Sequence, residues 1–345
     1  MNKIFVPILR SKQQAQYKAL KSLSSLKDFS KVSTRIIPYI ELKKDITFAT
    51  QNKYRIALET TTHFIEYYDE NFNEDNFEDL IAKTKSIAFS SNTIPSLKLD
   101  FKLFYYHKNI IIDLIKFFHA NNQKFALRLT NYINLNDIKE VLLNLNENDF
   151  LILDNEFSSM QTKIILSNYH SIAKTLRNKI IFFSTERSQQ PAKVYKNLDY
   201  TNFCNYDLIN FLKNNKGFYY HGIGSYCGAK ADNNEIGNSK VPIEAIFFEY
   251  SFLMNKFFII KSAIKGNIST IYTELTKYLS EIIDKNLNDS PLKEILELNG
   301  YSLVKLKEII LKQKSTHKNS TASNYIELTI EHYIEEMIHY YLINN

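Results

Sequence analysis

The sequence predicts an α/β fold of the (β/α)8 TIM-barrel type, and three observations predict it. Eight short apolar runs recur along the chain, and segments of helical periodicity separate most of them. Strands that alternate with helices in this way are typical of βαβ units and a parallel sheet. The runs are almost continuously apolar, as expected for strands buried on both faces. Eight units favour a closed barrel, and an open doubly wound sheet is the alternative.

The predicted strands are spaced closely enough for single helical connections in all cases but one. They cover residues 4–9, 36–42, 94–99, 124–129, 149–153, 179–183, 217–223 and 244–252. Helical spacing of apolar residues fills the intervals, as with Ala15, Ala19 and Leu23 in the first of them. The interval between the second and third strands is too long for one crossover. It predicts an insertion on the barrel over about residues 50–92.

The chain ends in a region of a different kind. Residues 266–345 are mainly helical in pattern and follow the last predicted strand. The sequence therefore predicts a barrel over residues 1–265 and a helical C-terminal extension, 266–345, packed on it.

Composition excludes several classes of protein. The chain has 345 residues, 44% of them hydrophobic, and a formal net charge of +6 without a concentrated basic run. This charge permits a nucleic-acid partner without indicating one. Two cysteines are too few for a secreted disulfide scaffold, and no apolar segment is long and unbroken enough to span a bilayer. We expect a soluble cytoplasmic protein with no membrane association.

Charged residues follow or end several of the predicted strands, where a barrel places its active site. The acidic candidates for catalysis are Glu41, Asp100 and Asp154. The candidates for ligand binding are Arg10, Lys12, Arg128 and Glu156. Carboxylates could bind Mg²⁺ or transfer protons, and arginines could hold a phosphate in bidentate fashion. Salt bridges that close the top of the barrel, or solvated strand ends, are the alternative interpretation.

Glycine is concentrated in one segment. Residues 217–237 hold five of the seven glycines of the chain. Such clustering predicts a constrained loop over the pocket, with His221, Ser225, Tyr226 and Lys230 as hydrogen-bond donors and Tyr226 facing inward. A structural turn after the seventh strand is the alternative. The spacing fits neither a dinucleotide-binding fingerprint nor a Walker A loop.

Four segments together resemble the phage beta-protein family and a related group of bacterial proteins. They read FVPILRSKQQAQYKAL, RIIPYIEL, GIGSYCG and YIELTIEHYIEEM. Arg10, Lys12, Gln13 and Glu41 match the motifs of the family directly. Ser225 stands where the family has an acidic residue, and Glu331-His332-Tyr333 stands where it has paired histidines.

The resemblance implies a role in phage conflict, such as antiphage defence, and adds Gln13 and His332 to the candidates for ligand binding. The leading hypothesis is a barrel pocket that binds a phosphorylated or nucleic-acid-derived ligand. If the protein is an enzyme, metal-dependent hydrolysis of a phosphoester, with Mg²⁺ as the cofactor, is the natural class. The alternative is a non-catalytic recognition or scaffold subunit that binds a phage protein or a nuclease-like partner.

Overall fold

The structure is a computed structural model of the full chain, and it divides into two compact units. It describes residues 3–11, 14–43, 45–68, 76–87, 91–99, 101–130, 135–154, 179–183, 199–202, 209, 212–214, 220–227, 246–253, 256–261, 273–274, 276–277, 279–281, 298, 300–316 and 322–344. The first unit comprises residues 1–12, 34–185 and 207–225, and the second comprises residues 13–33, 186–206 and 226–345.

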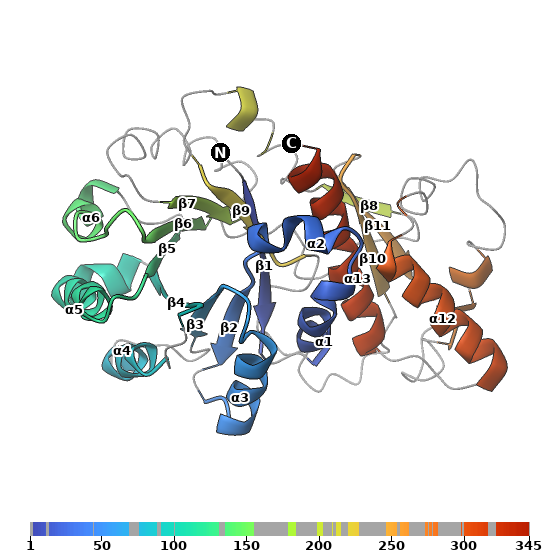
Figure 1. The fold of residues 1–345 in the computed structure, drawn as a ribbon, viewed down its shortest axis with the longest axis horizontal. Helices are drawn as coiled ribbons and strands as arrows, with labels where there is room; N and C mark the ends of the chain where they lie inside the picture. The colour runs from blue at the N-terminus through green and yellow to red at the C-terminus, as the bar shows by residue number, and fades with distance from the viewer. Residues whose placement is uncertain are drawn as a thin grey trace. The chain divides into compact units, whose positions relative to one another are not determined.

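The first unit is a closed barrel of eight parallel strands in the order β1-β2-β3-β4-β5-β6-β7-β9 (Figure 1). The strands are β1 (Ile4–Arg10), β2 (Tyr39–Lys43), β3 (His63–Tyr68), β4 (Thr93–Leu99), β5 (Ala126–Thr130), β6 (Phe150–Asp154), β7 (Lys179–Phe183) and β9 (Gly222–Ser225). β1 closes the barrel by pairing with both β2 and β9. The TIM-like barrel expected from the alternation of apolar runs and helical segments is therefore confirmed.

Helices cover the outside of this barrel. The helices described between its strands are α3 (Phe48–Ala57), α4 (Phe77–Lys85), α5 (Phe101–Ala120) and α6 (Leu135–Leu142). Figure 1 shows α4, α5 and α6 outside the strands β3 to β6. On α5, the residues Ile111, Leu114, Ile115 and Phe118 are fully buried. Their spacing gives the helix one apolar face, which packs inward.

The predicted insertion over residues 50–92 is wrong. The segment contains β3, which pairs in parallel with β2 on one side and β4 on the other. Two helix–strand units, not one crossover and an insertion, therefore occupy the long interval. The sequence HFIEYY was not recognised as a buried strand because Glu66 interrupts its apolar character.

The eighth predicted strand, 244–252, is not a strand of the barrel. It contains β10 (Ile246–Ser251), which pairs antiparallel with β11 (Lys256–Lys261). β11 also pairs antiparallel with β8 (Asp199–Asn202), so these three form a separate small sheet in the second unit. The barrel strands end at Ser225 rather than near residue 265, and the predicted domain boundary is wrong to that extent.

The second unit combines this sheet with helices from both ends of the chain. The helical elements are α1 (Gln14–Ser22), η1 (Leu23–Ser25), α2 (Phe29–Val32), α12 (Tyr301–Thr316), α13 (Ala322–Glu336) and a final π-helical segment, η4 (Met337–Ile343); η2 (Ser33–Arg35) spans the boundary between the units. α1 packs against α13, which also contacts β10 and α12. The helical pattern expected for the C-terminal region is present in α12, α13 and η4. None of the helices that the structure describes is long and apolar enough to cross a membrane.

Candidate functional site

The interior of the barrel carries a layer of aromatic rings. Tyr39 lies 5.6 Å from Phe64 and 5.1 Å from Phe183 between ring centroids, and Phe64 lies 5.0 Å from Phe150. These residues come from β2, β3, β6 and β7, so their side chains meet inside the barrel. These rings form an apolar layer inside the barrel, and Arg128 lies directly beside two of them, Tyr39 and Phe183.

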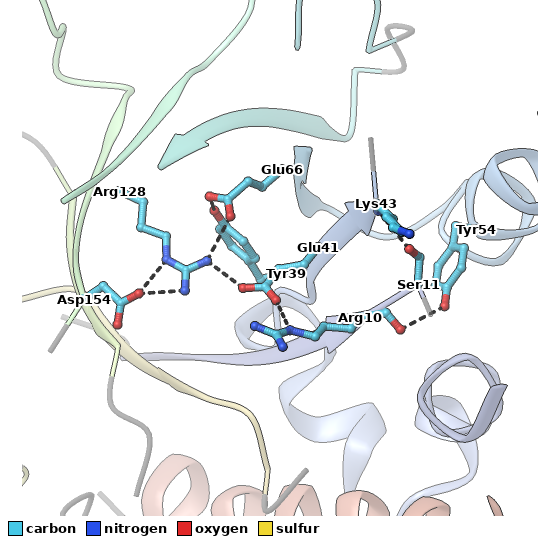
Figure 2. A network of polar contacts seen from close by, with 9 residues as sticks. All are labelled: Arg10, Ser11, Tyr39, Glu41, Lys43, Tyr54, Glu66, Arg128 and Asp154. Carbon is cyan, nitrogen blue, oxygen red and sulfur yellow. Dashed lines mark hydrogen bonds and ion pairs between the residues drawn. The ribbon is translucent and has the colours of Figure 1, made fainter. Parts of the chain in front are cut away.

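Five ionisable side chains form one network in contact with these rings, which we call the barrel cluster (Figure 2). Its members are Arg10, Glu41, Glu66, Arg128 and Asp154, all of them buried. Arg10 Nε donates to Glu41. Arg128 Nη1 donates to Glu41 at 2.8 Å and to Glu66 at 3.1 Å. Its Nε and Nη2 both bind Asp154 Oδ2, at 2.8 and 2.6 Å.

Arg128 is the centre of the cluster. It is 1% exposed, and its guanidinium carbon lies 5.3 Å from the Tyr39 ring centroid and 5.2 Å from that of Phe183. The Arg128 guanidinium is therefore hydrogen-bonded to carboxylates and packed against two aromatic rings, and both kinds of contact stabilise its positive charge.

Strand register explains why these side chains converge. Glu41 is directly opposite Arg10 on one neighbouring strand and opposite Glu66 on the other. Residues opposite each other in a parallel sheet share a face, so all three side chains point into the barrel. Arg128 lies on β5, separated from β2 by two strands, and it reaches Glu41 only across the interior. The side-chain alternation of β1, β2, β3, β5 and β6 thus directs the five ionisable side chains into the barrel.

Glu66 is the member whose ionisation is most affected by its surroundings. Burial raises the pKa of this carboxyl, the cation of Arg128 opposes the shift, and the neighbouring Glu41 adds to it. Tyr39 donates its hydroxyl hydrogen to Glu66 Oε2 at 2.5 Å, and the same hydroxyl lies 2.7 Å from Ser96 Oγ. Burial also raises the pKa of Tyr39 well above its usual value. The pair is therefore a place where a proton is held inside the barrel.

The backbone around Arg10 is fixed by contacts from two later elements. Tyr54 of α3 donates to the carbonyl of Arg10 at 3.4 Å, and Ser11 Oγ accepts from the backbone N–H of Lys43 at 3.1 Å (Figure 2). The N–H of Ser11 in turn donates to the carbonyl of Glu41. The end of β1 is thus tied to β2, which sets the position of the Arg10 side chain.

The structure brings together four of the residues predicted from strand ends. Arg10, Glu41, Arg128 and Asp154 meet in the barrel cluster, and they do so through salt bridges, as the alternative interpretation expected. The predicted residues Lys12, Gln13, Asp100 and Glu156 lie outside the described residues. Tyr226 and His332 belong to the second unit, where both are buried.

The glycine-rich segment is partly strand rather than loop. Gly222 and Gly224 lie in β9, inside the barrel wall, and Lys230 lies outside the described residues. A Cβ atom on Gly222 would come within 2.4 Å of the Ile4 carbonyl oxygen, and one on Gly224 within 2.8 Å of the Val6 carbonyl oxygen. Close approach of β1 therefore explains two of the glycines.

His332, the remaining candidate, lies on α13 in a second polar cluster. Its Nδ1 is 3.4 Å from Ser302 Oγ, and its Nε2 is 3.8 Å from Glu336 Oε1. Beside it, Glu335 accepts from the backbone N–H groups of Tyr301 and Ser302 at 2.6 and 3.1 Å. These are the first residues of α12, so this carboxylate caps a helix N-terminus, which is a structural role.

Three members of the site were not predicted from the sequence. Glu66, Tyr39 and Ser96 all point into the barrel from β3, β2 and β4. The signal that could have found Glu66 is the flanking pattern HFIEYY, in which aromatic and β-branched residues surround one acid. Tyr39 and Ser96 carry no signal of their own, since both types are common in strands and in cores.

The three carboxylates of the cluster converge on the Arg128 guanidinium rather than on a shared point between them. Among the residues that the structure describes, no group of three or more His, Cys, Asp or Glu side chains is arranged to hold a metal ion. The arrangement as described is suited to hydrogen bonding, charge compensation and proton transfer.

Comparison with known proteins adds no family to this description. No protein-family model matches the chain, and no curated protein matches it.

Proposed function

We propose that the carboxyl end of the barrel binds a phosphorylated or nucleic-acid-derived ligand, and that the protein acts in antiphage defence. The single observation that supports a site here is the barrel cluster: two arginines and three carboxylates meet inside the barrel. Ligands of TIM barrels bind at the carboxyl ends of the strands, where Arg10 and Asp154 are the last residues of β1 and β6. The antiphage role is supported by the resemblance of the four motifs alone, and such a protein would act in the cytoplasm.

Stability does not account for the barrel cluster. Taking charged groups out of water costs several kcal/mol per ion, and apolar residues of similar volume are often at least as stabilising as a buried ion pair. Clusters of ionisable groups with shifted pKa values are characteristic of functional sites. The cluster therefore supports a role in binding or chemistry.

Within the cluster, Arg10 is the natural contact for a phosphoryl group. Its side chain is 11% exposed, against 4% or less for the other four. Glu66, whose pKa is raised, is the natural proton donor or acceptor. General acid–base groups act best when their pKa lies near the working pH. If the ligand is a phosphoester, hydrolysis would be the reaction, with Mg²⁺ as a cofactor to be tested.

The second candidate is a non-catalytic subunit that recognises a phage protein or a nuclease-like partner. One observation favours it: Arg128 donates hydrogen bonds to three carboxylates of the barrel itself, those of Glu41, Glu66 and Asp154. A cation already neutralised by the protein is a poorer anion-binding group. Under this hypothesis the barrel cluster has a structural role inside the barrel, and partner proteins bind at another surface.

The experiment combines ligand-induced thermal shifts with a phage-plating assay. The probes are AMP, ribose 5-phosphate and inorganic phosphate, each with and without Mg²⁺. The site variants are Arg10→Ala and Glu41→Gln. The matched control is Asp149→Asn, which changes a buried carboxylate outside the cluster; Asp149 binds His119 at 2.7 Å and the Phe125 N–H at 2.9 Å.

A phosphorylated probe should raise the melting temperature of the wild-type protein by mass action. The two site variants should lose this shift and the plating phenotype, and Asp149→Asn should keep both after correction for its own stability. A wild-type protein that responds to no probe would contradict the ligand-binding proposal. Full plating activity in both folded site variants would favour the scaffold.

A further inference from the structure

Thr130, the last residue of β5, carries a buried hydroxyl group that makes no hydrogen bond to the described part of the chain. The residue is 1% exposed. Its Oγ1 atom has no hydrogen-bond partner among the residues that the structure describes. Leaving a buried polar group without a partner costs about 1–3 kcal/mol, so such a group calls for a physical explanation.

Three other buried threonine and serine hydroxyl groups of the same unit have partners. Thr84 donates to the Leu80 carbonyl at 2.8 Å, Thr93 lies 3.1 Å from His63 Nε2, and Ser96 lies 2.7 Å from the Tyr39 hydroxyl. Thr130 thus differs from hydroxyl-bearing residues in comparable strand and helix positions.

The position of Thr130 points to the barrel cluster. It follows Arg128 by two residues on the same strand, so its side chain shares the inward face with Arg128. It is also directly opposite Asp154, whose carboxylate binds that guanidinium. The hydroxyl therefore lies at the carboxyl end of the barrel, beside the cluster.

We propose that Thr130 binds the ligand of this site, and that its hydroxyl takes a sugar hydroxyl group rather than a phosphoryl oxygen. The inference rests on the proposed function and identifies a second part of the same ligand. Thr130 stands beside the Asp154 carboxylate, in a cluster with three carboxylates and two guanidinium groups. An anionic oxygen would be repelled at that edge, whereas a hydroxyl group can donate to Asp154 and exchange a hydrogen bond with Thr130. The phosphoryl group would lie toward Arg10, the most exposed cation of the cluster.

The first test is the stability of Thr130→Val, which keeps the shape and removes only the hydroxyl group. Because that hydroxyl has no partner to lose, the melting temperature of the free protein should stay the same or rise. The matched control is Thr84→Val, which breaks the bond to Leu80 and should lower the melting temperature. A drop for Thr130→Val as large as that of Thr84→Val would overturn the inference, because it would show a structural partner.

The second test is binding, measured by titration calorimetry with ribose 5-phosphate and with inorganic phosphate. Thr130→Val should weaken ribose 5-phosphate by about tenfold, the loss of one hydrogen bond, and leave inorganic phosphate unchanged. Equal affinity of both proteins for ribose 5-phosphate would overturn the role of Thr130 but not the phosphate site. Failure of the wild-type protein to bind either probe would overturn the proposed function and this inference with it.

Discussion

At the scale of single residues, Glu66 governs how the barrel cluster responds to pH. Burial raises its pKa above the usual 4.5, so the folded state holds the proton more tightly than the unfolded state. The stabilisation from Glu66 is complete below pH 4.5 and is lost as pH rises through the folded pKa. Glu66→Gln removes this titration. Its melting temperature should therefore fall less than that of the wild type between pH 4.5 and neutrality.

The control for this pH series is Glu308→Gln, which removes an exposed carboxylate from α12. It should follow the wild-type curve throughout the range, because this substitution leaves the barrel cluster unchanged. Parallel curves for Glu66→Gln and the wild type would contradict the assignment of a raised pKa to Glu66.

Arg128 provides the second prediction at this scale. Lysine keeps the charge but lacks the planar fork that reaches three carboxylates at once. Arg128→Lys should therefore destabilise the barrel by about 3–5 kcal/mol, the usual cost of breaking a buried ion pair. Chemical denaturation measures it, and a loss below about 1 kcal/mol would show that charge alone holds the cluster together.

Site residues could be predicted from the sequence where they end a recognised barrel strand, and not where the strand itself was missed. Arg10, Glu41, Arg128 and Asp154 were found because charges at strand ends converge in any parallel barrel. Glu66 was missed because a single buried acid made its strand resemble an exposed segment. An ionisable residue inside a buried strand thus indicates a site, but it also makes the strand harder to recognise from the sequence.

At the scale of elements, the pairing of β9 with β1 depends on the two glycines of β9, Gly222 and Gly224. Gly222→Ala would place a Cβ atom 2.4 Å from the Ile4 carbonyl oxygen, and the backbone must move to accept it. We expect a loss of about 1–3 kcal/mol for this overpacking, and a smaller loss for Gly224→Ala, whose Cβ atom would lie farther from the backbone, at 2.8 Å from the Val6 carbonyl oxygen. Thermal melts of both variants measure this order. Unchanged melting of Gly222→Ala would show that β1 and β9 are not in close contact.

α12 supplies the other prediction at this scale. Its first residues donate to Glu335, and the Lys27 N–H donates to the same carboxylate at 3.0 Å. Glu335→Ala leaves these buried and partly buried donors without this acceptor and should cost about 2–4 kcal/mol. Glu308→Ala, on the exposed side of the same helix, should cost less than about 0.5 kcal/mol. Equal melting temperatures for the two variants would contradict the capping role.

Helices and strands could be predicted where the periodicity of apolar residues is strong. The sheet to which each strand belongs could not be predicted. The run over 244–252 is a strand, but apolar character does not tell a parallel barrel strand from an antiparallel sheet strand. The total of eight barrel strands was correct because two errors compensated: β3 was missed, and β10 was counted in its place.

At the scale of the whole molecule, the two units alternate along the chain. All eight barrel strands lie before residue 226, whereas the second unit takes residues from near both ends. A fragment of residues 1–265 would keep α1 but lose α13, against which α1 packs. On α1, Ala15, Ala19 and Leu20 are buried in the full chain. We expect this fragment to expose apolar surface and to aggregate.

Soluble expression and the melting profile of the fragment measure this outcome, with the full chain as the reference. A monomeric fragment 1–265 with a cooperative melt would mean that the barrel unit does not depend on the C-terminal helices. The sequence could not predict this alternation, because the contacts that join α1 to α13 are between residues far apart in the chain.

This alternation also bears on how the protein is made. Ser22, at the end of α1, bonds to Glu331, 309 residues later in the chain. A ribosome adds about 5–20 residues per second, so tens of seconds pass between the synthesis of α1 and that of α13. During this time α1 cannot pack against α13. β1 likewise waits for β9 before the barrel can close. Neither contact can form until the later segment has been synthesised, so the nascent chain is a natural client for chaperones that shield apolar segments.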